Sequence, residues 1–251
     1  MKVDRNYYLR NAKYSQFLDT QSISDFKVYV KTIIKLASNS SRILDVGCGT
    51  GIVVDYLAKH GYLSYGIEIA NSSLKIARLK KGKYYSYDGD KLPFPDQSFD
   101  MVGSFNVVEH VNSVPDFLNE KLRIIKPKGY LIICAPNFLS ITNSFHYRTQ
   151  GLNRKFKNVV IIIRKRLSYA FTNVAKFETI KPTFRKDFHP DDDAINLINP
   201  IDLIKWGKEK RLELITYMGT SMPSSGIKKF LSGVPIIKFF FGSMLIVFQK
   251  S

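Results

Sequence analysis

The stretch ILDVGCGTG, residues 43–51, places three glycines directly behind a short apolar run. Ile43–Val46 is predicted to be a buried strand, and Ile52–Lys59 a helix that ends near Gly61. A glycine loop between a strand and a helix lets the backbone approach a ligand closely, and such loops bind nucleotide-like cofactors. Which cofactor is bound depends on the residues around the glycines.

Strands and helices alternate along the chain on both sides of this loop. Further helices are predicted at 22–37, 71–79, 114–125 and 200–211, and further strands at 62–67, 83–87, 99–105, 130–134, 212–218 and 243–249. The helix at 114–125 is expected to stop at Lys126-Pro127-Lys128-Gly129. This alternation predicts an α/β fold with a doubly wound, mostly parallel seven-stranded sheet, in which the last two strands form an antiparallel edge.

The length and composition indicate one globular domain. A chain of 251 residues with 45% hydrophobic and 24% charged residues fits a single domain over 1–251 that carries an insertion. Residues 1–38 are predicted to form an N-terminal helical cap, and 138–190, where the alternation stops, a basic helical insertion or lid. The first residues lack the apolar core of a signal peptide, and Cys48 and Cys134 match no zinc or redox spacing, so a reduced, cytoplasmic compartment is expected.

The positive charge is concentrated in one segment of the chain. The formal net charge is +17, and residues 151–190 carry ten lysines and arginines against Glu178 and Asp187. Such an excess predicts an anionic partner: a membrane surface, a nucleic acid or a phosphorylated substrate. A basic amphipathic helix here would lie peripherally on an anionic membrane. The alternatives are a solubilising surface and a helix packed on the sheet.

Acidic residues at the strand ends narrow the choice of cofactor. The loop has the spacing G-x-G-x-G, whereas dinucleotide-binding loops have G-x-G-x-x-G, and no Gly-Lys-Ser/Thr follows it. Asp45, two residues before the first glycine, would repel a pyrophosphate and suits a cationic amino group. Glu68 ends the second strand, where an acid can accept hydrogen bonds from ribose hydroxyls, and Asp88 could accept one from an adenine amino group. Together these acids favour S-adenosylmethionine over NAD, although Glu68 fits both.

Five segments in register resemble a known family. They are ILDVGCGTG, YGIEIA, YDGDKLPFPDQSFDMV, FNVVEHV and LRIIKPKGYLIICAPN, which together cover roughly residues 40–137. Their order and spacing resemble the class I S-adenosylmethionine-dependent methyltransferases, in particular the type 11 family. The resemblance implies a Rossmann-like methyltransferase fold, a single methyltransferase domain and S-adenosylmethionine as cofactor. The cofactor-binding residues that it implies are Asp45, Gly47, Cys48, Gly49, Gly51, Glu68, Ile69, Asp88, Gly89 and Asn106.

Within this resemblance each part of the cofactor has its own candidate residues. Asp45 and the loop glycines would hold the methionine part, Glu68 the ribose diol, and Asp88 with Gly89 the adenine. Asn106, after the fourth strand, would line the floor beneath the sulfonium.

Two histidines are candidate catalytic residues. His110 follows the fourth strand, where a general base for an oxygen or nitrogen acceptor could act; a purely structural histidine is the alternative. His189 precedes the late helix, at a place where related enzymes have residues that close over the substrate. The adjoining acidic run 191–193 is interpreted as a solvated loop or a partner for nearby cations rather than a metal site.

The EHV and APN elements are similar to those of the O-methyltransferases of ubiquinone biosynthesis, some of which bind a metal through Glu-x-x-Glu-His. Here Asn106 stands in place of the first glutamate, and an amide is a poorer ligand for a hard cation. No metal site is therefore predicted. The expected function is methyl transfer to a small or lipid-like acceptor that is prenylated, phenolic or glycosylated. The alternatives are an RNA methyltransferase, although no RNA-binding module is recognisable, and a non-catalytic cofactor-binding protein.

Overall fold

The computed structural model describes residues 12–138, 140, 160, 174–182, 193, 195–220 and 242–251. Most of the predicted basic insertion at 138–190 lies outside the described residues, as do residues 1–11 of the predicted cap and His189. The membrane-facing role predicted for 151–190 therefore also falls outside them. Among the helices of the described part of the chain, none is long and apolar enough to cross a membrane.

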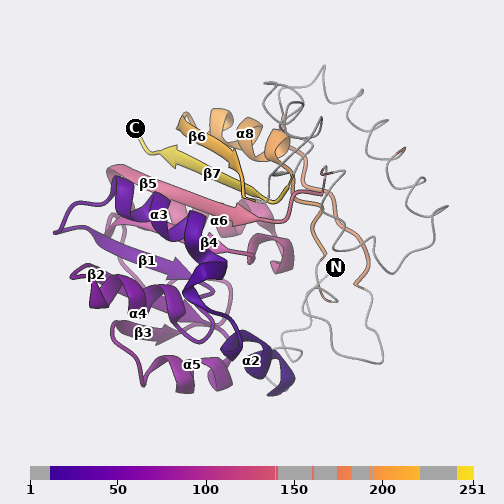
Figure 1. Cartoon of the computed structure of the whole chain (residues 1–251). Helices are drawn as coiled ribbons and strands as arrows, with labels where there is room; N and C mark the ends of the chain where they lie inside the picture. The colour runs from indigo at the N-terminus through magenta and orange to yellow at the C-terminus, as the bar shows by residue number, and fades with distance from the viewer. Residues whose placement is uncertain are drawn as a thin grey trace, which may run out of the picture.

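Seven strands form one mixed sheet. They are β1 (Arg42–Val46), β2 (Leu63–Glu68), β3 (Lys83–Ser86), β4 (Phe99–Phe105), β5 (Ile125–Ala135), β6 (Glu213–Gly219) and β7 (Met244–Gln249). Their order is β3-β2-β1-β4-β5-β7-β6 (Figure 1). The pairings from β3 to β5 are parallel, whereas β7 pairs antiparallel with both β5 and β6. The α/β class, the seven strands and the antiparallel edge predicted from the sequence are thus confirmed.

Helices cover both faces of this sheet. The helical elements are α2 (Ala12–Asp19), the 3-10 helix η1 (Ile23–Phe26), α3 (Lys27–Leu36), α4 (Ile52–Lys59), α5 (Asn71–Ala77), the 3-10 helix η2 (Val108–His110), α6 (Val114–Ile124) and α8 (Pro200–Glu209). Side chains of α3 and α4 share one buried apolar cluster with β1, β4, β5 and β7. Those of α6 and α8 share a second cluster on the opposite face. Two layers of helices around a sheet are what a doubly wound fold requires.

Strand β5 begins earlier than the sequence predicts. The helix was expected to run to Ile125 and the strand to start at Tyr130, but Ile125 already pairs with Phe99, and an irregularity follows before the regular ladder with β4. Proline is tolerated at such irregular positions. A β-carbon on Gly129 would lie 2.8 Å from the Asp100 carbonyl oxygen. The Lys126–Gly129 segment is therefore part of the strand instead of a turn before it.

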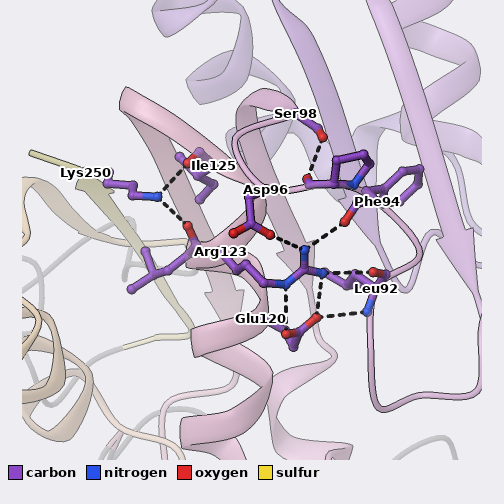
Figure 2. Close-up of polar contacts among 10 residues, drawn as sticks. Leu92, Phe94, Asp96, Ser98, Glu120, Arg123, Ile125 and Lys250 are labelled. Atoms are coloured by element: carbon purple, nitrogen blue, oxygen red, sulfur yellow. Dashed lines mark hydrogen bonds and ion pairs between the residues drawn. The ribbon is translucent and has the colours of Figure 1, made fainter.

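Arg123 of α6 forms hydrogen bonds with the loop that leads into β4 (Figure 2). Its guanidinium donates to the carbonyl oxygens of Leu92 and Phe94 at 2.9 and 2.8 Å. It also donates to the carboxylates of Glu120 and Asp96, and Glu120 accepts the Leu92 amide. A planar guanidinium can make these contacts at once because its donors have a fixed fork geometry. The loop between β3 and β4 is thereby held to the helix layer.

The strand order reverses between β1 and β4. In open α/β sheets ligands bind at such a reversal, outside the carboxyl ends of the strands. The carboxyl ends of β1, β2 and β4 lie next to one another in the sheet, so they bring Asp45, Glu68 and Asn106 to the same edge. The functional site is therefore expected at this edge.

Candidate active site

A cavity of about 260 Å³ lies at the carboxyl ends of β1, β2 and β4. Nine of the predicted site residues line it: Asp45, Gly47, Cys48, Gly49, Glu68, Ile69, Gly89, Asn106 and His110. Helix α2 adds Tyr14, Phe17 and Leu18 to its wall. The structure thus brings together residues that the sequence distributes over four separate segments.

The glycine loop holds its backbone in the left-handed region. Gly47, Gly49 and Gly51 have φ angles of +75°, +52° and +81°, which residues with a side chain adopt only at a cost. A β-carbon on Gly47 would lie 2.4 Å from Cγ2 of Val107, and one on Gly51 would lie 2.7 Å from the Tyr84 ring. Gly51 does not line the cavity but is the N-cap residue of α4. Its role in the structure is thus to start the helix, and direct cofactor contact by Gly51 stays a prediction.

Asp45 lies at the end of β1 beneath this loop. It is 5% exposed, and its Oδ1 accepts a hydrogen bond from the Tyr29 hydroxyl at 2.8 Å. The hydroxyl fits there because Gly103 of β4 has no side chain: a β-carbon at this position would lie 2.0 Å from it. Burial raises the pKa of Asp45 to about 7, although the Tyr29 hydrogen bond and the positive charge of Lys121 act to lower it. Asp45 is therefore a buried carboxyl group that gains from a cationic neighbour.

Lys121 of α6 is a cationic neighbour of Asp45 within the protein. It is fully buried on α6, donates a hydrogen bond to Oγ of Ser104, and lies over the Phe117 ring with Nζ 4.2 Å from its centroid. Burial lowers the pKa of Lys121 to about 7, against the negative charge of Asp45, which acts to raise it. A buried charge is tolerated where a partner of opposite sign compensates it. Lys121 does not line the cavity, so its effect on the site reaches Asp45 through the sheet.

Glu68 joins the end of β2 to the glycine loop. Its Oε2 accepts the Gly49 amide at 3.0 Å, and its Oε1 accepts the amides of Ile69 and Ala70 at 2.9 and 3.0 Å. Burial raises the pKa of Glu68, while these three hydrogen bonds favour the ionised form. A carboxylate offers about four lone-pair positions, so one on Oε2 remains for a further donor. In this arrangement Oε2 of Glu68 can accept a hydrogen bond from a ribose hydroxyl, and the contact of Glu68 with the ribose diol stays a prediction.

Asp88 and Asn106 differ in their relation to the cavity. Asp88 is exposed, accepts the Asp90 amide at 3.0 Å, and does not line the cavity, whereas its neighbour Gly89 does. The adenine contact predicted for Asp88 therefore stays a prediction. Of the two residues predicted to contact the adenine, Gly89 is the one that lines the cavity. Asn106 lines the cavity and has a φ of +52°. Its backbone N–H donates a hydrogen bond to the Cys134 carbonyl oxygen at 2.8 Å. This bond ties the end of β4 to β5.

His110 lies at the end of η2 between two buried carboxylates. Its Nδ1 lies 3.2 Å from Oδ1 of Asp193, and its Nε2 lies 3.7 Å from Oε1 of Glu109. Of the two interpretations of 191–193, the solvated loop is wrong at Asp193, which is only 2% exposed. The other interpretation, a partner for nearby cations, stays open. Within the described residues, no three His, Cys, Asp or Glu side chains are grouped so as to hold a metal ion.

Comparisons with solved structures identify the fold of the chain. Its fold resembles a crystal structure of an S-adenosylmethionine-dependent methyltransferase from Mesorhizobium loti, with a TM-score of 0.58 and 15% identity over 88% of this chain and 96% of that one. It also resembles one from Aquifex aeolicus, with a TM-score of 0.55 and 14% identity over 95% and 98% of the two chains. The fold is therefore that of the Rossmann-like methyltransferases.

A protein-family model matches part of the chain. Residues 44–133 match the model of the type 11 methyltransferases, described as "Methyltransferase domain". The resemblance seen in the motifs is thereby confirmed, and the domain together with the fold implies S-adenosylmethionine as the cofactor.

Two curated relatives each match a little over a third of the chain. A demethylmenaquinone methyltransferase of Tropheryma whipplei (strain Twist) is 36% identical over 98 residues, which are 37% of this chain and 41% of the relative. A ubiquinone biosynthesis O-methyltransferase of Bartonella tribocorum is 28% identical over 102 residues, 38% of this chain and 41% of the relative. The chain thus matches about two fifths of the length of these relatives.

The residues of the cavity fit this cofactor. The glycine loop leaves room for a ligand against the backbone, Asp45 offers a carboxylate for an ammonium group, and Oε2 of Glu68 retains an acceptor position. Thr50 also lines the cavity, and its hydroxyl is buried without a hydrogen-bond partner among the described residues. A buried polar atom of this kind costs stability unless a ligand or water satisfies it. The donor set therefore suits a polar, positively charged cofactor.

Proposed function

We propose that this chain is an S-adenosylmethionine-dependent methyltransferase that acts on a small or lipid-like acceptor. The observation that carries the proposal is the cavity at the carboxyl edge of the sheet, where Asp45, the glycine loop and Glu68 meet His110. The first three fit the cofactor, and the histidine adds a group that can take a proton. Cofactor-binding groups and a potential base therefore line one cavity.

The residues divide the work of methyl transfer between binding and proton removal. When bound, S-adenosylmethionine supplies an electrophilic methyl carbon; its bond to sulfur breaks with the electron pair left on sulfur as the acceptor heteroatom bonds to that carbon and gives up one proton. Asp45 and Glu68 hold and orient the cofactor, because such a displacement chiefly needs the reacting atoms to be aligned. His110 takes the proton that the acceptor gives up.

The acceptor is proposed to be a small, largely apolar molecule with an ionisable hydroxyl or amine, of the phenolic or prenylated kind. Apolar and aromatic side chains, among them Phe17, Leu18, Phe105 and Val111, line the cavity beside His110. Such a lining with a few polar groups is typical of small-molecule sites. The names of the relatives, which refer to demethylmenaquinone and ubiquinone biosynthesis, favour a quinone-related acceptor.

Purified protein incubated with methyl-labelled S-adenosylmethionine and fractionated cell extract is expected to label the lipid or small-molecule fraction. Asp45→Ala and Glu68→Ala should each lower cofactor affinity, measured by calorimetry, at least tenfold, because each removes a carboxylate from the cavity. NAD serves as the control ligand and should give no response. Label in RNA would favour the RNA methyltransferase alternative, and cofactor binding without label in any fraction would favour the non-catalytic one.

Peripheral membrane binding through 151–190 stays a proposal from charge alone. The purified chain is expected to float with vesicles that contain anionic lipid, and not with neutral vesicles, because basic residues near the headgroups gain from the negative surface. Reversal of the three charges at Arg164, Lys165 and Arg166 should abolish flotation. Reversal at Lys59, an exposed cation of α4, is the matched control. Binding that survives the triple reversal contradicts the proposal.

A further inference from the structure

We propose that Tyr29 is a positioning residue for the cofactor: its hydroxyl holds Oδ1 of Asp45, so that Oδ2 is the oxygen presented to the ammonium group of S-adenosylmethionine. This inference rests on the proposed function, in which Asp45 holds that group. It adds a residue that does not itself line the cavity. It starts from one contact, the hydrogen bond that the Tyr29 hydroxyl donates to Oδ1 of Asp45 at 2.8 Å.

This hydrogen bond is enclosed by protein. Tyr29 is 0% exposed and Asp45 is 5% exposed. A buried carboxylate is costly without a donor, and a hydrogen bond to a charged acceptor is stronger than one between neutral groups. Burial also raises the pKa of the Tyr29 hydroxyl well above its ordinary value. The hydroxyl therefore keeps its proton and stays a donor over the pH range in which Asp45 changes its charge.

A helix and a strand together fix the direction of the bond. Tyr29, Val30 and Ile33 are buried residues of α3 and belong to the apolar cluster on one face of the sheet. Within the sheet, Gly103 of β4 is the register partner of Asp45 on β1. A β-carbon on Gly103 would overlap the Tyr29 hydroxyl. The hydroxyl thus reaches Asp45 across a strand position that has no side chain, and this packing holds the carboxyl group in one orientation.

The orientation determines which oxygen is left for the cofactor. Asp45 lines the cavity and Tyr29 does not, so the hydroxyl bonds to the carboxylate from within the protein. A carboxylate has two oxygens that accept hydrogen bonds. With Oδ1 bonded to Tyr29, Oδ2 remains for an ammonium donor, and a carboxylate that is oriented before the ligand arrives loses less freedom on binding. Tyr29 therefore acts through Asp45 and does not touch the cofactor.

The same bond acts on the charge of Asp45. It favours the ionised carboxylate and so opposes burial, which raises the pKa of Asp45. Removal of the hydroxyl should raise this pKa further and leave less of Asp45 ionised at pH 7. The other titratable groups around the pair in the described part of the chain are Cys48, Glu68, Tyr84, His110, Lys121 and Cys134. A change at residue 29 alone leaves all of them in place.

The test is calorimetry of S-adenosylmethionine binding to the full chain and to Tyr29→Phe. Phenylalanine keeps the ring and its tilted contact with Phe105, whose centroid lies 5.7 Å away. Loss of one hydrogen bond to a charged acceptor should raise the pKa of Asp45 by roughly one unit. Affinity at pH 7 is then expected to fall about tenfold, and the protons released on binding should rise from about one half to close to one. Two buffers of different ionisation enthalpy count these protons.

Tyr65→Phe is the matched control. Tyr65 of β2 is 7% exposed, packs edge-on against Phe99 and does not line the cavity. Loss of its hydroxyl should leave both affinity and proton release unchanged. Unchanged affinity in Tyr29→Phe overturns the proposal. A loss of affinity with the proton release of the wild type overturns it as well, because a purely structural role of Tyr29 would give that result.

A second measurement needs no change at residue 29. The cofactor-free chain is labelled with ¹³C at Cζ of its fourteen tyrosines. We expect one tyrosine signal to move between about pH 5.5 and 8 as Asp45 ionises, and to stay still in Asp45→Asn. The signal should persist in Tyr84→Phe, because Tyr84 also senses the charge of Asp45.

Absence of such a signal overturns the proposal even if Tyr29→Phe fails to fold. Failure of the proposed function is a separate result, because it shows as a wild-type chain that binds no S-adenosylmethionine or that transfers no label.

Discussion

Replacement of Gly47 by alanine is expected to weaken the binding of S-adenosylmethionine at least tenfold and to lower the melting temperature by several degrees. Two costs add at this position. A φ of +75° penalises any residue with a β-carbon by about 1–2 kcal/mol. The new methyl group would also lie 2.4 Å from Cγ2 of Val107, at the wall of the cavity.

The second cost affects the ligand as well as the fold. Val107 is β-branched, so its side chain has few rotamers with which to escape. Either the glycine loop or the start of η2 has to shift, and both line the cavity. A shift of a few tenths of an ångström in a closely packed site disturbs several contacts at once. Cofactor affinity should therefore fall more than the backbone strain alone explains.

Two further variants separate strain from the clash. Gly61 has a φ of +88°, and a β-carbon there would meet nothing within 4 Å, so Gly61→Ala should lower stability by a similar strain and leave cofactor affinity unchanged. Val107→Ala combined with Gly47→Ala removes both Cγ atoms and leaves the nearest atom of residue 107 at 3.4 Å. Part of the affinity should return in this double variant. Calorimetry and thermal melts measure both quantities, and equal losses of affinity in the Gly47 and Gly61 variants would contradict the argument.

Local sequence patterns were sufficient for most of the fold. Helix α4 and strand β4 have the bounds that the sequence predicts, because an apolar run between glycines or turn residues leaves little choice of register. The start of β5 could not be predicted in this way. Lys126–Gly129 has the composition of a turn, and only its pairing with the strand before it, Phe99 with Ile125, makes it part of the sheet. Tertiary contacts override local propensity there.

The residues of the candidate site also divide into those that local sequence patterns predict and those that only tertiary contacts reveal. Asp45, Glu68 and the glycines are recognisable because they follow strands in a fixed order, and the structure places them around one cavity, Gly51 excepted. Tyr29 and Lys121 were missed, since an aromatic and a lysine on helices give no sign that they meet an acid across a sheet. Asp193 was misread as solvated, because in one sequence nothing links it to His110. Partners of this kind are visible only once the chain is folded.

The binding of S-adenosylmethionine is expected to weaken at least about tenfold between pH 7 and pH 5.5, and to release close to one proton at the lower pH. The reason is the state of Asp45, whose pKa burial raises to about 7. An ammonium group binds to the ionised carboxylate, so below this pKa each binding event must first remove a proton. The ionised fraction falls from about one half at pH 7 to a few per cent at pH 5.5, and the apparent affinity falls with it.

The direction of this effect follows from the signs of the charges. Asp45 bears its charge above its pKa, and a cation favours that form, so cofactor affinity rises with pH through 7 and the bound cofactor lowers the pKa of Asp45 in return. The pH range in which affinity is expected to rise ends near pH 7, because the α-ammonium group of the cofactor itself loses its proton near pH 8. Lys121 opposes the effect of burial on the pKa of Asp45, because its charge stabilises the ionised carboxylate. Lys121→Met should therefore move the midpoint of the affinity curve to higher pH.

Calorimetry in two buffers of different ionisation enthalpy counts the protons released at each pH. Asp45→Asn keeps the shape of the side chain and an oxygen that can accept from Tyr29, but it has no proton to lose. We expect its affinity to be low and independent of pH between 5.5 and 7. Glu68 and His110 also line the cavity and carry ionisable groups, and they remain in this variant. A slope that persists in Asp45→Asn would assign the proton to one of them, and the cation-binding role of Asp45 would then be wrong.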